Sequence, residues 1–214
     1  MPKVWDWDLA GQALPLLLQG FLVTLAATVV ASVVAIILGL VLAMLRRTRF
    51  AAVRAPVRAF VEFVRSTPVM VQLFAVYVVF PGLSPFTIGV TVLGIHYATY
   101  MSEVYRAGID GVPKGQWEAA TALSLPRGRT WRAVILPQAV RNVLPALGNY
   151  VISMFKDTPF LAVITVHEMV FQATTFGGDH FKYLEVFTMA AAIFLIASYP
   201  TSLLVRRLEK RLGH

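Results

Sequence analysis

FLVTLAATVVASVVAIILGLVLAML, residues 21–45, decides the fold of this chain. The stretch contains no charged residue, and a helix needs about 20 predominantly apolar residues to cross the roughly 30 Å hydrocarbon core of a bilayer. The whole chain has the same character, since 57% of its 214 residues are hydrophobic and only 14% are charged, against about 45–50% and about 25% in soluble proteins. We therefore predict an all-α integral membrane protein.

Four further apolar stretches are long enough to span a membrane. Buried helices of a soluble protein are the alternative, but five such helices in 214 residues leave too little polar surface to cover them. We expect a transmembrane domain over residues 20–207, an external N-terminal segment over 1–19 and a cytosolic tail over 208–214. The five predicted spans cover about 21–45, 59–80, 86–107, 143–166 and 186–205, with a loop over 108–142.

The basic residues predict the orientation of these spans. Lys and Arg cluster between the first two spans, around the loop 108–142 and after the last span, whereas the opposite side holds only Lys3 and Lys182. Cytoplasmic loops of membrane proteins carry the excess of Lys and Arg. We therefore expect the N-terminus outside the cell, the C-terminus in the cytosol, and the linkers 81–85 and 167–185 outside.

Several function classes are excluded by residue types. The net charge of +8 does not indicate a nucleic-acid partner, because the basic clusters are separated by long apolar runs and lack interleaved aromatic residues. The absence of cysteine excludes disulfides, thiolate metal sites and cysteine nucleophiles. An intramembrane enzyme would need a convergent nucleophile–base or metal set, which His96 and Glu103 alone do not supply, so we expect no catalytic residues, metal or cofactor on this chain.

The segment 114–125, KGQWEAATALSL, is predicted to form a short helix after Pro113. At 1.5 Å per residue this helix is about 18 Å long, too short to span a bilayer. It should therefore lie on the membrane or project below it, and Pro126 should end it. An ordinary amphipathic loop helix is the plain interpretation of this pattern.

The same segment resembles the EAA loop of ATP-binding-cassette (ABC) importer permeases. The resemblance rests on Glu118–Ala119–Ala120, the small residue Ser124, the aliphatic Val134 and the pair Leu136–Pro137. That family usually has glycine at the position of Ser124, which would suit a left-handed helix end. The resemblance implies that this short helix docks into a separate ATPase through Gln116, Glu118, Ala119, Ala120, Ser124, Arg127, Leu136 and Pro137. The chain has no G-x-x-x-x-G-K-S/T phosphate loop of its own.

The resemblance extends to most of the chain. EFVRSTPVMVQLF (62–74), SEVYRAGIDGVPKGQWEAA (102–120) and LPALGNYVISMFKDTP (144–159) are similar to polar-amino-acid permeases of the histidine, glutamine and arginine type. Residues 94–109 and 155–169 look most similar to the ectoine/hydroxyectoine permease subunit.

This resemblance implies a type I ABC importer transmembrane domain in the bacterial inner membrane. The implied partners are a second permease chain, identical or related, two ATPase subunits that hold ATP and Mg²⁺, and an extracytoplasmic solute-binding protein. The linker 167–185 is either a contact for that binding protein or a merely solvated loop. The implied substrate is a polar zwitterionic solute, and an autonomous channel or secondary transporter is the alternative.

A polar stripe in the third predicted span is a candidate translocation path. His96, Tyr100 and Glu103 share one helix face at spacings of four and three, and charged or polar groups at membrane depth tend to face a cavity or the interior of a bundle. Glu103 also lies three residues before Arg106, so a simple ion pair near the cytosolic surface is equally open.

The pair Lys156–Asp157 is a second candidate for the path. It lies about 22 Å along the fourth span, too deep to reach the inner surface, and Thr158–Pro159 breaks the helix directly after it. Such a break at membrane depth is tolerated where protein or a water-filled cavity surrounds it. The pair therefore indicates either a gate or substrate contact, or a buried structural ion pair.

Overall fold

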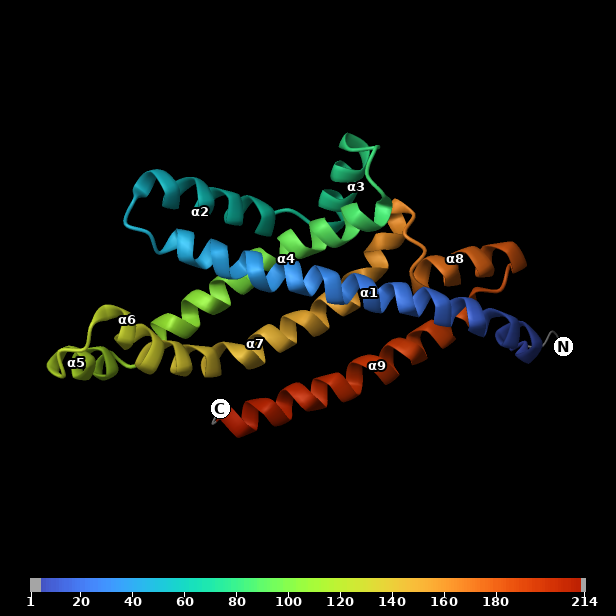
Figure 1. Ribbon diagram of the computed structural model, residues 1–214. Coiled ribbons are helices and arrows are strands. Elements are labelled where there is room, and N and C mark those ends of the chain that lie inside the picture. Colours follow the sequence, from blue (N-terminus) through green and yellow to red (C-terminus); the bar gives the residue numbers. More distant parts are fainter. Residues whose placement is uncertain (1–4, 213–214) are drawn as a thin grey trace.

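The computed structural model describes residues 5–212 and is entirely helical in its regular elements over that range (Figure 1). Residues 1–4, with the predicted external Lys3, and residues 213–214 of the predicted tail lie outside the described residues. The helices are α1 (Trp7–Arg46), α2 (Ala51–Arg65), α3 (Val69–Val79), α4 (Pro85–Asp110), α5 (Lys114–Ala122), α6 (Arg127–Arg129), the π-helix η1 (Thr130–Ile135), α7 (Leu136–Asp157), the 3₁₀-helix η2 (Thr158–Ile164), α8 (Met169–His180) and α9 (Tyr183–Leu212). The all-α prediction is confirmed.

The five predicted spans correspond in order to α1, α2 with α3, α4, α7 with η2, and α9. Two helices, α1 and α9, are long and apolar enough on their own to cross a membrane, and the number rises to four if each of two bent helix pairs counts as one span. The helix α4 has 26 residues and is largely buried. Because neighbouring helices cover it, α4 tolerates more polar side chains than a helix that faces lipid.

Helix boundaries differ from the predicted segments in several places, and the linker 167–185 is not a merely solvated loop, because most of it is the helix α8, which packs on α1 and α9. The external segment predicted over 1–19 is helical from Trp7 and continuous with the first span. The second span, predicted as one helix, bends by 105° between α2 and α3, because Pro68 has no N–H to donate and disfavours helix in Thr67. The predicted break after Asp157 coincides with the change from α7 to η2.

The helix α1 has a small-residue face turned inward and a large apolar face turned outward. Ala27, Ala31 and Ala35 are completely buried, whereas Leu22 and Ile37 are more than half exposed. Small residues let helix backbones approach closely in membranes. α4 uses this face of α1, and the two helices lie against one another along much of their length (Figure 1).

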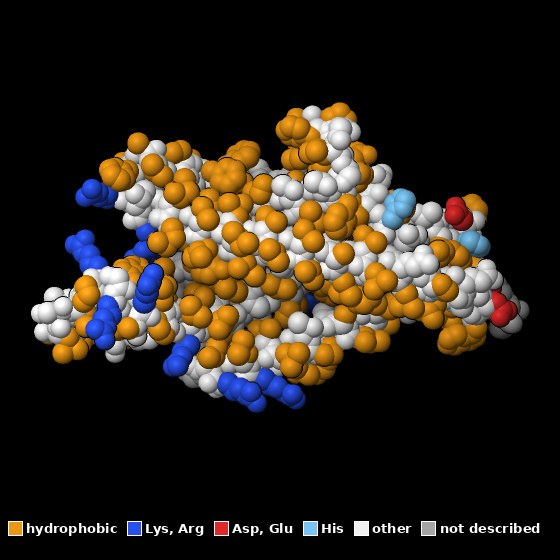
Figure 2. Space-filling model, in the orientation of Figure 1, with side chains coloured by type: hydrophobic (Ala, Val, Ile, Leu, Met, Phe, Trp, Pro, Cys, Tyr) orange, Lys and Arg blue, Asp and Glu red, His pale blue; other side chains and the backbone are white. Residues whose placement is uncertain are grey.

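Charged side chains gather at the two ends of the molecule. Figure 2 shows Lys and Arg at the end that carries α2, α5 and the C-terminal end of α9, Asp, Glu and His at the opposite end, and a broad apolar surface between them. Apolar side chains of this middle surface suit a lipid environment. The asymmetry of the ends is the pattern on which the predicted orientation rests.

The contact between α1 and α8 brings two backbones close together and offers a test of this packing. The carboxylate of the fully buried Glu168 accepts hydrogen bonds from Phe171 N at 2.6 Å and from Thr24 Oγ1 at 3.4 Å, which caps α8 and ties it to α1. A Cβ on Gly20 of α1 would lie only 2.7 Å from Met169 Cα. The space at Gly20 therefore limits how closely α8 can approach.

We predict that Gly20→Ala destabilises the fold by about 1–3 kcal/mol, because the added methyl group must push two backbones apart. Gly11→Ala is the matched control, since nothing lies within 4 Å of a Cβ at this position of the same helix. The thermal unfolding midpoint of each variant in detergent measures the effect. Equal midpoints for the two variants would contradict the packing described here.

Candidate functional site

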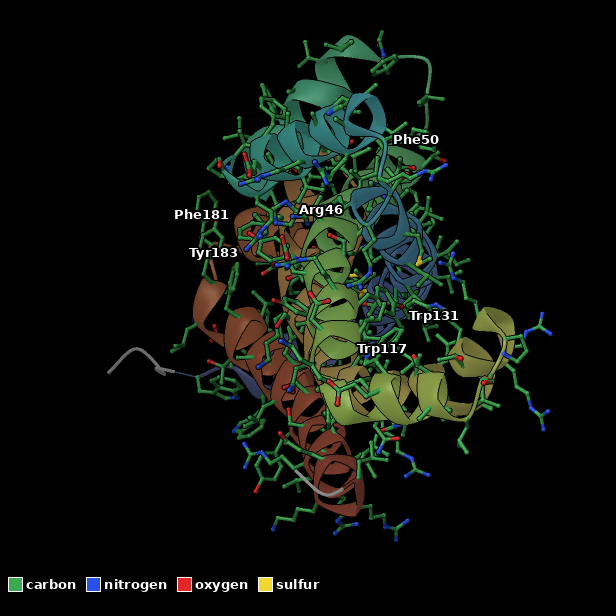
Figure 3. The ribbon with its side chains drawn as sticks, turned by 90° about the vertical axis from the view of Figure 1, so that its left-hand side faces the viewer. Arg46, Phe50, Trp117, Trp131, Phe181 and Tyr183 are labelled. Carbon is green, nitrogen blue, oxygen red and sulfur yellow. The ribbon has the colours of Figure 1, made fainter. Side chains whose placement is uncertain are left out.

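The short helix α5 is held against the rest of the chain by a pair of tryptophans. The rings of Trp117 on α5 and Trp131 on η1 meet edge to face with centroids 5.3 Å apart (Figure 3). Both rings pack on a buried apolar cluster that includes Ile109 and Ile135. This arrangement fixes one face of α5 and leaves the opposite face free.

Most of the residues expected to dock into an ATPase are exposed, on α5 itself or on the segments that follow it. Ala119 is exposed, whereas Ala120 is only 2% exposed and belongs to the packed face. Leu123, which the motif did not indicate, is 73% exposed at the end of α5, and its apolar side chain four residues after Ala119 was the signal available in the sequence. The other expected residues are also exposed: Gln116, Glu118, Ser124, Arg127, Leu136 and Pro137.

Ser124 forms the left-handed turn that its family position implies. Its φ is 52°, and the N–H of Leu125 donates to Ala120 O at 3.0 Å across the helix end. A residue with a Cβ pays roughly 1–2 kcal/mol for this conformation, so serine keeps the glycine geometry at some cost. The question that the sequence left open is thus answered, since Ser124 ends the helix in the left-handed turn that the usual glycine would suit.

The segment after this turn is continuous with the fourth span. Residues 127–157 pass from α6 through η1 into α7 without a break. The middle part, Thr130–Ile135, is a π-helix, a rare form that occurs mostly as local bulges, frequently at functional sites. The C-terminal part of the predicted loop 108–142 therefore belongs to one continuous helical segment, residues 127–157, which ends at Asp157. We call this segment the helical rod.

A second cluster joins aromatic and polar side chains of α3, α4 and α7. Tyr97 OH donates to Asp157 Oδ2 at 2.7 Å, and the rings of Tyr97, Tyr100 and Tyr150 lie 5.8–6.3 Å apart. His96 lies beside Tyr100, with ring centroids 5.3 Å apart. We call this set, together with Gln72, the aromatic–aspartate cluster.

Gln72 of α3 closes the cluster on one side. Its Oε1 lies 3.2 Å from His96 Nδ1, and its Nε2 donates to Val64 O at 2.7 Å at the end of α2. The amide therefore braces the bend between α2 and α3 while it holds the histidine ring. Sequence reasoning missed Gln72, although it is the single amide side chain in an otherwise apolar helix.

The structure thus brings together some predicted path residues and separates others. His96, Tyr100 and Asp157 lie in the aromatic–aspartate cluster, and the sequence did not single out Tyr97 or Tyr150. Lys156 is exposed and makes no ion pair with Asp157 among the described residues. The interpretation of Lys156 and Asp157 as a buried ion pair is therefore wrong, because Asp157 bonds to Tyr97 instead.

Glu103 belongs to an ionic cluster at the basic end of the molecule. Its carboxylate meets Arg46 at 2.7 Å, Arg106 at 2.8 Å and Arg65 at 3.4 Å. The predicted pair with Arg106 is confirmed. Arg65 connects this cluster to the aromatic–aspartate cluster, since its guanidinium carbon lies 5.0 Å from the ring centroid of Tyr100.

Glu62 pairs with Arg58, one turn earlier on α2, with Arg58 Nε 2.8 Å from Glu62 Oε1. The pair lies on the surface of α2, where a single ion pair contributes little to stability.

Comparison with known proteins identifies the family. The model described as "Binding-protein-dependent transport system inner membrane component" matches residues 35–214. The chain belongs to this family of permeases. It is a transport subunit of an amino-acid ABC importer in the inner membrane, and the ATPase is on a separate subunit.

Related proteins cover nearly the whole permease. The "Probable amino-acid ABC transporter permease protein y4tG" of Sinorhizobium fredii is 45% identical over 93% of this chain and 88% of its own. The glutamine transport system permease protein GlnP of Escherichia coli is 34% identical over 97% of this chain and 98% of its own. A solved structure titled as an amino acid ABC transporter with histidines has a TM-score of 0.91 at 32% identity, covering 97% of this permease and 99% of that chain.

Membership of this family decides between the two kinds of transport protein that the sequence left open. An autonomous channel or secondary transporter is set aside, since these relatives are ABC transporter permeases. The type I importer fold predicted from the EAA resemblance is confirmed by the structural match.

We predict that Ser124→Val opens the turn after α5 and Ser124→Gly does not. A β-branched residue strongly disfavours a positive φ, whereas glycine adopts it without steric cost, so the two variants should differ by about 1–2 kcal/mol. The rate of limited proteolysis between α5 and α6 measures the opening, with Ala122→Val on the exposed face of α5 as the control for β-branching. Identical cleavage rates for the two Ser124 variants would show that the turn is not left-handed.

Proposed function

We propose that the permease imports a polar zwitterionic solute by alternating access, driven by separate ATPase subunits through α5. The solute is an amino acid or a compatible solute such as ectoine or hydroxyectoine. The observation that carries the proposal is the aromatic–aspartate cluster with Arg65 at one side of it. This arrangement offers one place for a positive group and another for a carboxylate.

Asp157 and its tyrosines form the cation-binding end of this proposed path. Aromatic ring faces attract cations, with about 2 kcal/mol or more when the site is desolvated. The carboxylate of Asp157 accepts a hydrogen bond from Tyr97 alone among the described side chains. It therefore has acceptor capacity left for the ammonium or amidinium group of a solute.

Arg65 forms the anion-binding end. A guanidinium binds a carboxylate through two parallel hydrogen bonds. Arg65 covers Tyr100, and Asp157 bonds to Tyr97. These two tyrosines are three residues apart, about 4.5 Å along the helix axis, so both charged groups of one small solute fit along a single turn of α4. Lys156 and His96 are further candidates for the wall of this path.

The relatives support the amino-acid class and leave the particular solute open. GlnP of Escherichia coli is a glutamine permease and TcyB of Bacillus subtilis, 35% identical over 96% of this chain and 91% of its own, is an L-cystine permease. The proposal of an ectoine-type solute rests on the resemblance of residues 94–109 and 155–169 to ectoine permeases.

The proposed assembly has a second permease chain, identical or related, two ATPases that carry ATP and Mg²⁺, and a solute-binding protein outside. The permease itself carries no cofactor in this proposal and has no nucleic-acid partner. Its N-terminus lies outside and its C-terminus in the cytosol, which places α5 on the side where ATP is available. The exposed face of α5 then meets the ATPase through Ala119 and Leu123, whose small and apolar side chains suit a close protein contact.

We predict that Ala119→Cys cross-links to a cysteine in the co-expressed ATPase and that Ala120→Cys does not. The first side chain is exposed and the second is buried against the permease itself, so the two neighbours form a matched pair. Gel analysis after oxidation of membrane vesicles measures the cross-link. Uptake that persists after deletion of the ATPase, or equal cross-linking at both positions, would contradict the proposed coupling of the ATPase through α5.

We predict that Asp157→Asn lowers uptake about tenfold or more while the complex still assembles. Asparagine keeps an acceptor for Tyr97 but loses the negative charge that a cationic group would meet. Uptake of labelled glutamine and labelled ectoine in cells, with co-purification of the ATPase as the assembly readout, measures both effects. Asp8→Asn, in the exposed first turn of α1, is the control for loss of one carboxylate. Unchanged uptake, or loss of assembly in place of uptake, would remove Asp157 from the path.

A further inference from the structure

A pocket of about 400 Å³ opens at the basic end of the molecule, where α1, α2 and α4 meet. Arg46, at the end of α1, reaches from one wall toward α4 (Figure 3). The pocket is lined by Arg46, Arg54, Arg58, Glu62, Glu103 and Arg106. Apart from its edge with Glu103, this pocket takes no part in the proposed substrate path.

The lining of the pocket has more positive than negative charge. Four arginines face two glutamates. Glu103 is shared by Arg46 and Arg106, and Glu62 is bound to Arg58. Arg54 makes no ion pair within residues 5–212. An anion in the pocket would therefore meet guanidinium groups whose charge the protein does not balance.

Exposed apolar side chains lie on a second face of α2, which Phe63 begins one residue after Glu62 of the pocket. Phe60 and Phe63 of α2 are 42% and 68% exposed, and α2 buries only Val61 and Val64. Phe63, next to Glu62 of the pocket, lines an apolar groove of about 280 Å³ between the α2–α3 bend and α4. A soluble anion would leave this apolar surface unused, whereas a lipid would cover it.

We propose that the pocket binds the phosphate headgroup of an anionic phospholipid, whose acyl chain lies along the exposed phenylalanines of α2. Arginine forks match phosphate oxygens in paired hydrogen bonds. Anionic lipids of the cytoplasmic leaflet attract basic groups at the membrane surface, and the charge asymmetry of the molecule (Figure 2) puts this pocket at the end predicted to face that leaflet. The bound lipid would stabilise α2 beside α1 and α4.

The test compares lipid retention by two double variants with equal loss of charge. Arg54→Gln/Arg58→Gln removes two pocket arginines that do not touch Glu103, and Arg206→Gln/Arg207→Gln removes two arginines of α9 outside the pocket. Each full-length permease, purified with its co-expressed ATPase, is equilibrated with mixed phosphatidylglycerol and phosphatidylcholine, and native mass spectrometry counts retained lipids. We expect phosphatidylglycerol affinity to fall about tenfold in the pocket variant and to stay at the wild-type value in the control.

Further variants and measurements distinguish lipid binding from the binding of free phosphate and from a folding defect. Phe60→Ser/Phe63→Ser should also reduce phosphatidylglycerol retention, because it removes the apolar contact and leaves the arginines. Equal retention by the pocket variant and the α9 control would overturn the proposal. Complete displacement of the lipid by millimolar inorganic phosphate, with no effect of the phenylalanine changes, would also overturn it in favour of a free anion. The thermal midpoint of every variant checks folding, and Arg54→Lys/Arg58→Lys, which keeps both charges, should retain most of the lipid.

Discussion

The close contact between α1 and α4 determines where the polar groups of this permease lie. A Cβ on Gly39 would be 3.0 Å from both Ala98 O and Met101 Cβ, and one on Gly94 would be 2.6 Å from Val34 Cγ1. Because the two backbones are this close, the Ala98–Met101 side of α4 is fully occupied by α1. His96, Tyr100 and Glu103 share a different side of α4 by helical periodicity. They are therefore left to face α2, α3 and α7, and Glu103 meets α1 only through Arg46 at its end.

The helical rod 127–157 connects the two ends of the proposed mechanism. At 1.5 Å per residue it is about 45 Å long, with Trp131 near one end and Asp157 at the other. Since Trp117 fixes α5 against Trp131, movement of α5 must either be carried along the rod or be absorbed within it. Two places in the rod are suited to absorb such movement, the π-helical turn at Thr130–Ile135 and Pro145, which has no N–H to donate within α7. The rod therefore links the proposed coupling face to the path without an intervening loop.

Sequence patterns predicted the helices, the short helix α5 among them, because these depend on local properties. Apolar length predicts spans, Pro113 and Pro126 bound α5, and the family position of Ser124 predicted its left-handed turn. The bend at Thr67–Pro68 carries the same local signal, but the apolar run through it concealed the break.

Side-chain partners were harder to predict because they depend on contacts between distant segments. Asp157 is adjacent to Lys156 in sequence, yet the side chains of successive helical residues point about 100° apart. In the folded chain the partner of Asp157 is Tyr97, which lies sixty residues away in the sequence. Glu103 likewise collects arginines from α1 and α2 that no local spacing indicates. Residue type predicted that these groups need partners, and only the packing of helices selects the partners.

Arg65 is the arginine of the ionic cluster that the protein can release most easily. Of the three arginines at Glu103 it has the longest contact, 3.4 Å against 2.7 Å for Arg46 and 2.8 Å for Arg106. If Arg65 turned toward a solute, Glu103 would keep two partners, so no carboxylate would be left uncompensated in a partly buried site. Removing Arg46 instead would break the strongest contact between α1 and Glu103. Because three arginines surround Glu103, the guanidinium of Arg65 can leave this carboxylate. It lies at the edge of the aromatic–aspartate cluster, where it could bind the carboxylate of a solute.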